Sequence, residues 1–149
     1  MRLPLLLLAA LAALAGCDSG TRSVTTVSNG WIRLPAVAGQ PAAGYFTIEA
    51  TDDHGALIRV TSSRAGRIEM HKTSMSGSMA GMEKVERISL KGGREIAFAP
   101  GGRHLMLFDL DPALRAGGTA DLIFHFEHGA PATFEASVVG PGDESPVRE

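Results

Sequence analysis

The 149-residue sequence contains one cysteine, Cys17, and this scarcity excludes several kinds of chemistry. No disulfide can form within the chain, because a disulfide needs two cysteines. Blue-copper electron transfer needs a cysteine ligand beside two histidines, and thiol redox chemistry needs a reactive cysteine. Because Cys17 follows an apolar leader, the folded domain has no thiolate to supply either function.

The sequence also lacks a large excess of either charge. There are 14 Lys and Arg residues and 16 Asp and Glu residues, which give a net charge of −2 at pH 7. A protein that binds nucleic acid usually presents a strongly basic face, so nucleic acid is not expected as a partner. The length that follows the leader suits one domain with a substantial core.

A sustained helical period is missing as well. Short apolar runs alternate with turn residues, and the sequence contains 18 glycines and 8 prolines. This pattern is typical of an all-β sandwich or barrel. The strands are predicted at Val24–Val27, Trp31–Leu34, Gly44–Glu49, Ala56–Thr61, Arg67–Lys72, Glu83–Leu90, Glu95–Ala99, His104–Leu110, Thr119–Glu127 and Thr133–Val139.

The first seventeen residues are predicted to be an export signal. Arg2 supplies a short basic region, and the apolar run Leu3–Leu14 is too short for a membrane span. The run ends in Leu-Ala-Gly-Cys at residues 14–17, which resembles a bacterial lipobox. We therefore expect cleavage before Cys17 and acylation of that residue. The alternative is ordinary signal cleavage, with Cys17 discarded or left free and the protein soluble in the periplasm.

Short polar segments flank the predicted domain of residues 24–139. Residues 18–23 are expected to form a tether between the lipid and the fold, and residues 140–149 a disordered tail. Asp18 directly follows the cysteine, which resembles the signal that retains lipoproteins in the inner membrane of many Gram-negative bacteria. The protein is accordingly expected to be anchored on the periplasmic side of a bacterial membrane.

Methionine and histidine are concentrated in one window, residues 70–106. Apart from the initiator, every methionine lies there, together with two of the five histidines: Met70, Met75, Met79, Met82, Met106, His71 and His104. Methionines that fill gaps in a core should be scattered along a domain. Thioether sulfur prefers Cu(I), and imidazole also binds copper, so the cluster indicates a soft metal site.

Strand alternation supports this interpretation. His104 and Met106 are two residues apart and should point to the same face of a strand, while Leu105 points to the other face and the core. If Met70 is buried, His71 emerges on the polar face of its strand. Met82 follows a segment rich in Gly, Ser and Met, Ser74–Gly81, which is expected to be a mobile loop.

The spacing His71, ten residues, Met82, twenty-one residues, His104, one residue, Met106 resembles the signature of the periplasmic Cu(I) chaperones called PCuAC. Similar flanking patterns are Glu-Met-His at residues 69–71, Pro-Gly-Gly-Arg-His-Leu-Met-Leu at 100–107, Gly-Trp-Ile-Arg at 30–33 and Gly-Tyr-Phe-Thr-Ile at 44–48. The resemblance extends from about Val24 to Val139. It implies a cupredoxin-like Greek-key β-sandwich or barrel, a single domain, which agrees with the strand pattern.

The resemblance also implies a function. The domain would bind one Cu(I) through His71, Met82, His104 and Met106, with Met75 or Met79 as possible auxiliary ligands, and it would not be an enzyme. The recipient would be the copper A centre of cytochrome c oxidase subunit II. The alternatives are a periplasmic copper-buffering or resistance protein with no dedicated recipient, and a metal-free β-sandwich used in adhesion or assembly.

The remaining candidate residues are interpreted as structural. Trp31 is expected in the core or at its rim, His54 in an exposed turn, and His125 and His128 on the surface. His104 lies near Arg103 and Asp109, yet no nucleophile motif accompanies them. Zinc hydrolase chemistry favours carboxylate or thiolate ligands beside histidine, and two thioethers fit zinc poorly. Some PCuAC members carry a tail rich in His and Met that binds Cu(II), and residues 140–149 contain neither residue.

Overall fold

A computed structural model describes residues 25–147, so the predicted leader and tether lie outside the described residues. Residues 25–147 contain no helical segment that could span a bilayer. The described chain consists of strands joined by turns and one short 3-10 helix. In order, the elements are β1 (Thr26–Arg33), β2 (Ala42–Glu49), η1 (Asp52–His54), β3 (Ala56–Thr61), β4 (Ala65–Ser76), β5 (Met79–Lys84), β6 (Ile88–Ser89), β7 (Glu95–Phe98), β8 (Arg103–Leu110), β9 (Thr119–Phe126) and β10 (Ala132–Val139).

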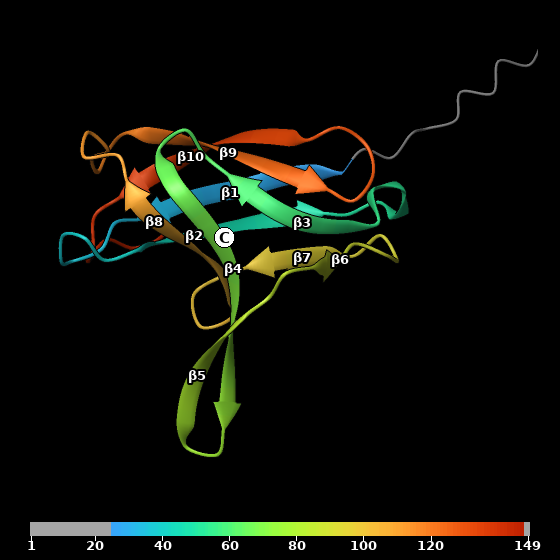
Figure 1. Cartoon of the computed structure of the whole chain (residues 1–149), viewed down its shortest axis with the longest axis horizontal. Coiled ribbons are helices and arrows are strands. Elements are labelled where there is room, and N and C mark those ends of the chain that lie inside the picture. Colours follow the sequence, from blue (N-terminus) through green and yellow to red (C-terminus); the bar gives the residue numbers. More distant parts are fainter. Residues whose placement is uncertain (1–24, 148–149) are drawn as a thin grey trace, which may run out of the picture.

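The strands form one ten-stranded sheet, in the order β5-β4-β8-β2-β1-β10-β9-β3-β6, with β7 also paired to β2. Strands remote in sequence are neighbours: β8 lies beside β2, and β10 runs parallel to β1. The sheet coils until β3 packs against β4, but no ladder joins these two strands, so the sheet stays unclosed (Figure 1). The predicted all-β class is confirmed.

The core lies inside this coil because the inward residues of each strand are apolar. Phe46 stacks on Phe98, with ring centroids 4.2 Å apart, and meets the edge of Phe124 at 4.8 Å. Leu105 and Leu107 on β8 are fully buried, and burying a leucine side chain stabilises a fold by roughly 1.5–3 kcal/mol. These two leucines fix the face of β8 that points inward, and therefore also the face that points outward.

One predicted turn is a bulge. The sequence pattern placed two strands on either side of Asn29–Gly30, whereas the structure has the single strand β1, with a register shift against β2 between Ser28 and Trp31. Asn29 takes a left-handed backbone conformation, φ 55°, which asparagine tolerates better than most residues. A side chain at Gly30 would clash with the ring of Phe134, 2.5 Å from an added Cβ.

The segment around Met75 and Met79 differs most from its prediction. The expected loop Ser74–Gly81 is instead a two-stranded hairpin, in which β4 and β5 project from the body of the domain (Figure 1). A two-residue turn, Gly77–Ser78, joins the strands, and φ of Gly77 is 63°. This conformation fits a type II′ turn, which favours glycine first. The predicted strand Glu83–Leu90 is correspondingly divided between β5 and β6.

Residues 140–147 follow β10 without regular structure. They remain beside the first strand, because the guanidinium of Arg33 donates a hydrogen bond to the carbonyl oxygen of Asp143 at 3.0 Å. Arg33 also lies over the ring of Trp31, 4.9 Å from its centroid.

Candidate metal centre

The four predicted ligands lie on three neighbouring strands, with β4 between β5 and β8. His71 pairs directly with His104 on β8, and Glu69 pairs with Met106. Residues directly opposite on an antiparallel ladder point to the same face, and diagonal neighbours lie about 7–8 Å apart, within reach of long side chains. Met106 is the diagonal neighbour of His71 on one side.

The hairpin places Met82 in the equivalent position on the other side. His71 pairs with Lys84, and Thr73 pairs with Met82, so Met82 is also a diagonal neighbour of His71 on the same face. His71 is thus the central residue of the set. The opposite face of β4 carries Met70, which is buried, as the alternation required.

His104 is oriented by the backbone of its own turn. Its Nδ1 lies 3.2 Å from the carbonyl oxygen of Gly102. A carbonyl only accepts, so Nδ1 carries the hydrogen and Nε2 keeps its lone pair for a metal. The rings of His71 and His104 are near-parallel, 25° apart, with centroids separated by 6.0 Å.

His71 is oriented by a carboxylate. Its Nε2 donates to Oε2 of Glu69 at 3.0 Å, and both side chains are largely buried, with 14% and 17% exposed. Nδ1 of His71 is buried and has no hydrogen-bond partner among the described residues. Because Nε2 carries the hydrogen, this orphaned nitrogen bears a lone pair. A buried acceptor without a partner is costly, and a metal ion on this face would satisfy it.

Glu69 is a residue of the candidate site to which the sequence pattern assigned no role of its own. Arg67 at 3.0 Å and Lys84 at 3.6 Å hold its carboxylate, in addition to His71. The hydrogen bond from His71 is the main cause that lowers the pKa of Glu69, and the two cations lower it further. The signal in the sequence was the spacing: Glu69 and His71 are two apart and therefore share one strand face.

The exposed methionines differ in the face that they occupy. Met75, Met79 and Met82 are 68%, 74% and 62% exposed, which is unusual for so apolar a side chain. Met75 pairs with Ala80 and shares the face of Met82, whereas Met79 pairs with Ser76 on the reverse face. Of the two predicted auxiliary ligands, only Met75 is therefore aligned with the site.

The arrangement offers two imidazole nitrogens and two thioether sulfurs on one face. All four groups are neutral when they bind a metal, and thioethers favour a soft ion such as Cu(I). Among residues 25–147, no three His, Cys, Asp or Glu side chains are grouped as a metal site. The methionines are what distinguishes this face from the rest of the described surface.

Two of the other histidines, His54 and His125, have structural partners. His54 is partly buried rather than exposed as expected: its Nδ1 lies 3.1 Å from Oγ1 of Thr25, and its ring meets the edge of Phe126 at 4.7 Å. Nε2 of His125 lies 2.9 Å from Oγ1 of Thr61. Burial lowers the pKa of His125, and the charge of Arg59 adds to this effect.

A family model described as "Putative lipoprotein LpqE-like" matches residues 25–138. "Uncharacterized protein RP573" of Rickettsia prowazekii (strain Madrid E) is 33% identical over 88 residues, which are 58% of this chain and 49% of that protein. The chain spans about half to two thirds of the length of the curated relatives that it matches, 49% and 63%.

Solved structures share the fold. "Copper-bound PCuAC domain from PmoF2" is 23% identical with a TM-score of 0.64, and the match covers 78% of this chain and 93% of that one. "Solution structure of CuI-DR1885 from Deinococcus Radiodurans" is 24% identical with a TM-score of 0.61, covering 84% and 85%. At this identity the likeness concerns the fold, and it confirms the predicted resemblance to PCuAC domains at that level.

Proposed function

The chain belongs to the family described as "Putative lipoprotein LpqE-like", and from this premise we propose that it is an extracytoplasmic copper chaperone. In this proposal it binds one Cu(I) through His71, Met82, His104 and Met106. The copper-bound PmoF2 domain and the Cu(I) form of DR1885, which have the same fold, support copper as the cargo.

The orphaned Nδ1 of His71 is the observation that carries the proposal. This nitrogen is buried without a hydrogen-bond partner, and it belongs to the residue at the centre of the ligand set. His104 keeps its own lone pair on Nε2, because Gly102 occupies Nδ1. In its neutral form each imidazole therefore keeps one nitrogen lone pair for a metal, while its other nitrogen is fixed by a hydrogen bond.

The geometry also divides the ligands into a fixed and an exposed side. His104 and Met106 lie on β8, whose reverse face is anchored in the core by Leu105. Met82 lies on the projecting hairpin and is 62% exposed. An incoming ligand can replace Met82 first while the ligands of β8 retain the ion. Because all four ligands are neutral, an acceptor site with cysteine thiolates binds Cu(I) more tightly and draws it forward.

The recipient that we propose is the copper A centre of cytochrome c oxidase subunit II, on the basis of the PCuAC resemblance. A lipid at Cys17 would hold the donor on the membrane that also contains the oxidase. Two or more acyl chains suffice for stable anchoring, and the tether raises the effective concentration of donor near recipient.

A transfer experiment tests the proposal. The Cu(I)-loaded protein is mixed with the reduced, copper-free soluble domain of subunit II, and copper is followed on each protein. A parallel sample places a Cu(I) chelator behind a dialysis membrane to measure release of free ion. Direct handover predicts transfer much faster than release. Transfer at the rate of release would favour a copper-buffering protein without a dedicated recipient.

Anchoring is tested separately. The protein is expressed in a Gram-negative host, and membranes are separated from the soluble periplasm. The parent protein should remain with the membranes and carry acyl chains by mass spectrometry, and Cys17→Ser should lose them. A parent protein found wholly in the soluble fraction would contradict the anchor.

A further inference from the structure

A basic cleft lies on the side of the domain away from the copper ligands. It has a volume of about 600 Å³, and its walls include the aliphatic side chains of Val85, Ile88 and Ile96. Five cations line it, with one carboxylate, Glu95: Lys72, Arg87, Lys91, Arg94 and Arg103. The chain has 14 Lys and Arg in total and a net charge of −2, so this concentration of positive charge is local.

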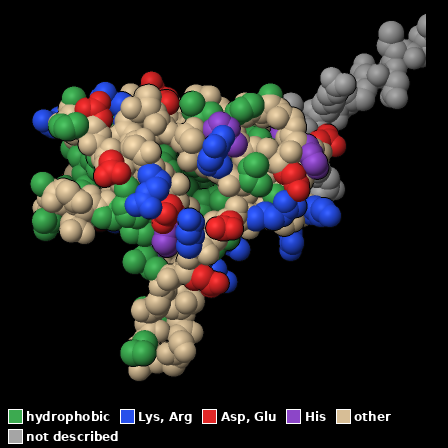
Figure 2. Space-filling view, in the orientation of Figure 1, with side chains coloured by type: hydrophobic (Ala, Val, Ile, Leu, Met, Phe, Trp, Pro, Cys, Tyr) green, Lys and Arg blue, Asp and Glu red, His purple; other side chains and the backbone are tan. Residues whose placement is uncertain are grey.

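Four of these five cations form no ion pair within the described chain. Arg87 forms two hydrogen bonds with Glu127, at 2.6 and 2.7 Å. For the other four cations, no ion pair is formed with any carboxylate of the described chain. Figure 2 shows Lys and Arg side chains gathered between the root of the hairpin and the end of the domain. Unpaired cations around a concave surface attract an anionic ligand.

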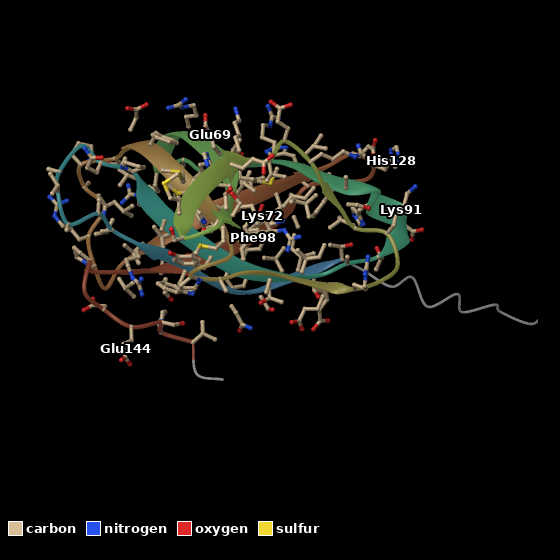
Figure 3. The ribbon with its side chains drawn as sticks, turned by 90° about the horizontal axis from the view of Figure 1, so that it is seen from below. Glu69, Lys72, Lys91, Phe98, His128 and Glu144 are labelled. Carbon is tan, nitrogen blue, oxygen red and sulfur yellow. The ribbon has the colours of Figure 1, made fainter. Side chains whose placement is uncertain are left out.

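The position of the cleft relative to the copper ligands follows from strand alternation. Lys72 and Arg103 pair with each other and directly adjoin His71 and His104 in sequence. They therefore point to the opposite face of β4 and β8 from the two histidines. Glu69 and Lys72 can be followed on β4 in Figure 3. A ligand in the cleft would leave the copper face open.

The outer rim of the cleft lies at the end of the domain where β1 begins. The carbonyl of Arg94 accepts from the amide of Ala50 at 3.4 Å, and the amide of Leu90 donates to the carbonyl of Gly55 at 3.0 Å. Oγ1 of Thr25, the first described residue, accepts from the amide of Thr51 at 3.0 Å. In Figure 3, Lys91 also lies near this end, close to His128. The rim of the cleft therefore lies close to Thr25, where the described part of the chain begins.

We propose that this cleft binds the phosphate headgroup of an anionic phospholipid and orients the domain on the membrane. The inference rests on the lipoprotein character of the family and does not depend on copper binding. Guanidinium groups match phosphate oxygens with paired hydrogen bonds, and lysine adds charge. The aliphatic wall suits the glycerol and ester atoms beside the phosphate. The copper face then points away from the lipid, toward a partner.

Vesicle sedimentation tests the proposal with the lipid-free mature chain, residues 18–149. One set of vesicles contains equal parts of phosphatidylglycerol and phosphatidylcholine, and the other contains phosphatidylcholine alone. The test variant is Lys91→Gln with Arg94→Gln, and the matched control is Arg59→Gln with Arg115→Gln, which removes the same charge outside the cleft. Each cation near an anionic surface contributes about fivefold in affinity, so the test variant should bind about 25-fold more weakly.

The control variant should bind anionic vesicles with an affinity within about twofold of that of the parent protein. The variant Lys91→Arg with Arg94→Lys keeps both charges and should retain binding. Equal losses in the test and control pairs, or no preference for anionic vesicles, would overturn the proposal. Displacement by inorganic phosphate well beyond that by chloride at matched ionic strength would instead make free phosphate the ligand. Cu(I) titration of the same proteins is read independently. If the parent protein bound anionic vesicles but did not bind Cu(I), the proposed chaperone function would be refuted and the proposal for the cleft would not be affected.

Discussion

Glu69 contributes no ligand in this account, yet it decides which nitrogen of His71 meets the metal. The hydrogen bond from Nε2, 3.0 Å long, leaves the lone pair on the buried Nδ1. The same hydrogen bond lowers the pKa of Glu69, so the carboxylate stays ionised to a lower pH than an ordinary glutamate does. A carboxylate that orients a ligating histidine typically contributes 10–100-fold to metal affinity.

We therefore predict that Glu69→Gln lowers Cu(I) affinity by about 10–100-fold. Gln has the same size but no charge, so it holds the imidazole tautomer less firmly. Nitrogen NMR shifts of His71 should show a mixture of tautomers in the copper-free variant. Glu83→Gln removes the same charge from the hairpin and serves as the control. Equal affinities for the two variants would show that Glu69 does not orient the ligand.

At Met106 the prediction concerns sulfur itself. Met106→Leu keeps volume and apolarity, so stability should change by less than about 1.5 kcal/mol. Cu(I) affinity should fall by more than about tenfold, because one of four ligands is lost. Met79→Leu is the matched control, since Met79 occupies the reverse face of the hairpin. Competition with a Cu(I) chelator measures the affinity of both variants. If Met106→Leu bound Cu(I) as tightly as the parent protein, Met106 would not be a ligand.

At the scale of single elements, the β4–β5 hairpin decides where Met82 lies. Gly77 opens the turn at φ 63°, and an added Cβ would meet nothing within 4 Å. The cost of Gly77→Ala is therefore conformational, about 1–2 kcal/mol for a non-glycine residue in this region. The hairpin should open more often, which withdraws Met82 from the other ligands.

Cu(I) affinity of Gly77→Ala should consequently fall, by no more than the loss caused by Met82→Leu. In a protein that already carries Met82→Leu, the added Gly77→Ala should have no effect. Ser78→Ala, at the neighbouring turn position, serves as the control. Additive losses in the double variant would mean that the turn acts on copper binding by another route.

Strand patterns predicted these elements unevenly. Alternation placed His104 and Met106 on one face and Leu105 in the core, because burial enforces it strictly. The β4–β5 hairpin was not predicted, because it is rich in Ser, Gly and Met, which have weak strand preference. Gly77–Ser78 is nevertheless a recognised hairpin signal. Asn29–Gly30 has the composition of a turn but forms a bulge. Pairing of His71 with His104 could not be predicted, because register between distant strands depends on the assembled sheet.

At the scale of the whole molecule, stability should depend on pH through His125. Burial lowers its pKa below the usual value of about 6.5 for imidazole. The unfolded chain therefore binds a proton at a higher pH than the folded chain does. The free energy of unfolding should fall as pH drops from about 6.5 to the lower pKa of the folded state.

In the variant His125→Gln the free energy of unfolding should fall less over this pH range, since glutamine does not titrate. Urea unfolding of the copper-free protein at about pH 7.5 and 5.5 measures the change. His128→Gln, which removes an exposed imidazole, serves for comparison. The same pH dependence in the parent and in His125→Gln would contradict the role of burial.

The two faces of the β4–β8 pair give the molecule its overall organisation. One face carries the imidazoles and thioethers. The other face carries Met70, which is buried in the core, and the cations Lys72 and Arg103, which line the basic cleft. The projecting hairpin extends the copper face beyond the body of the domain (Figure 1). In the proposed orientation, the cations face the membrane and the imidazoles and thioethers face a partner.

X-ray absorption spectroscopy of the copper-loaded protein shows whether one Cu(I) is held by two imidazoles and two thioethers. We expect one copper per chain, in the Cu(I) edge position, with two nitrogen and two sulfur neighbours. Met106→Leu should lose one sulfur, and Met79→Leu should lose none. A shell without sulfur, or one that Met106→Leu leaves unchanged, would contradict the site.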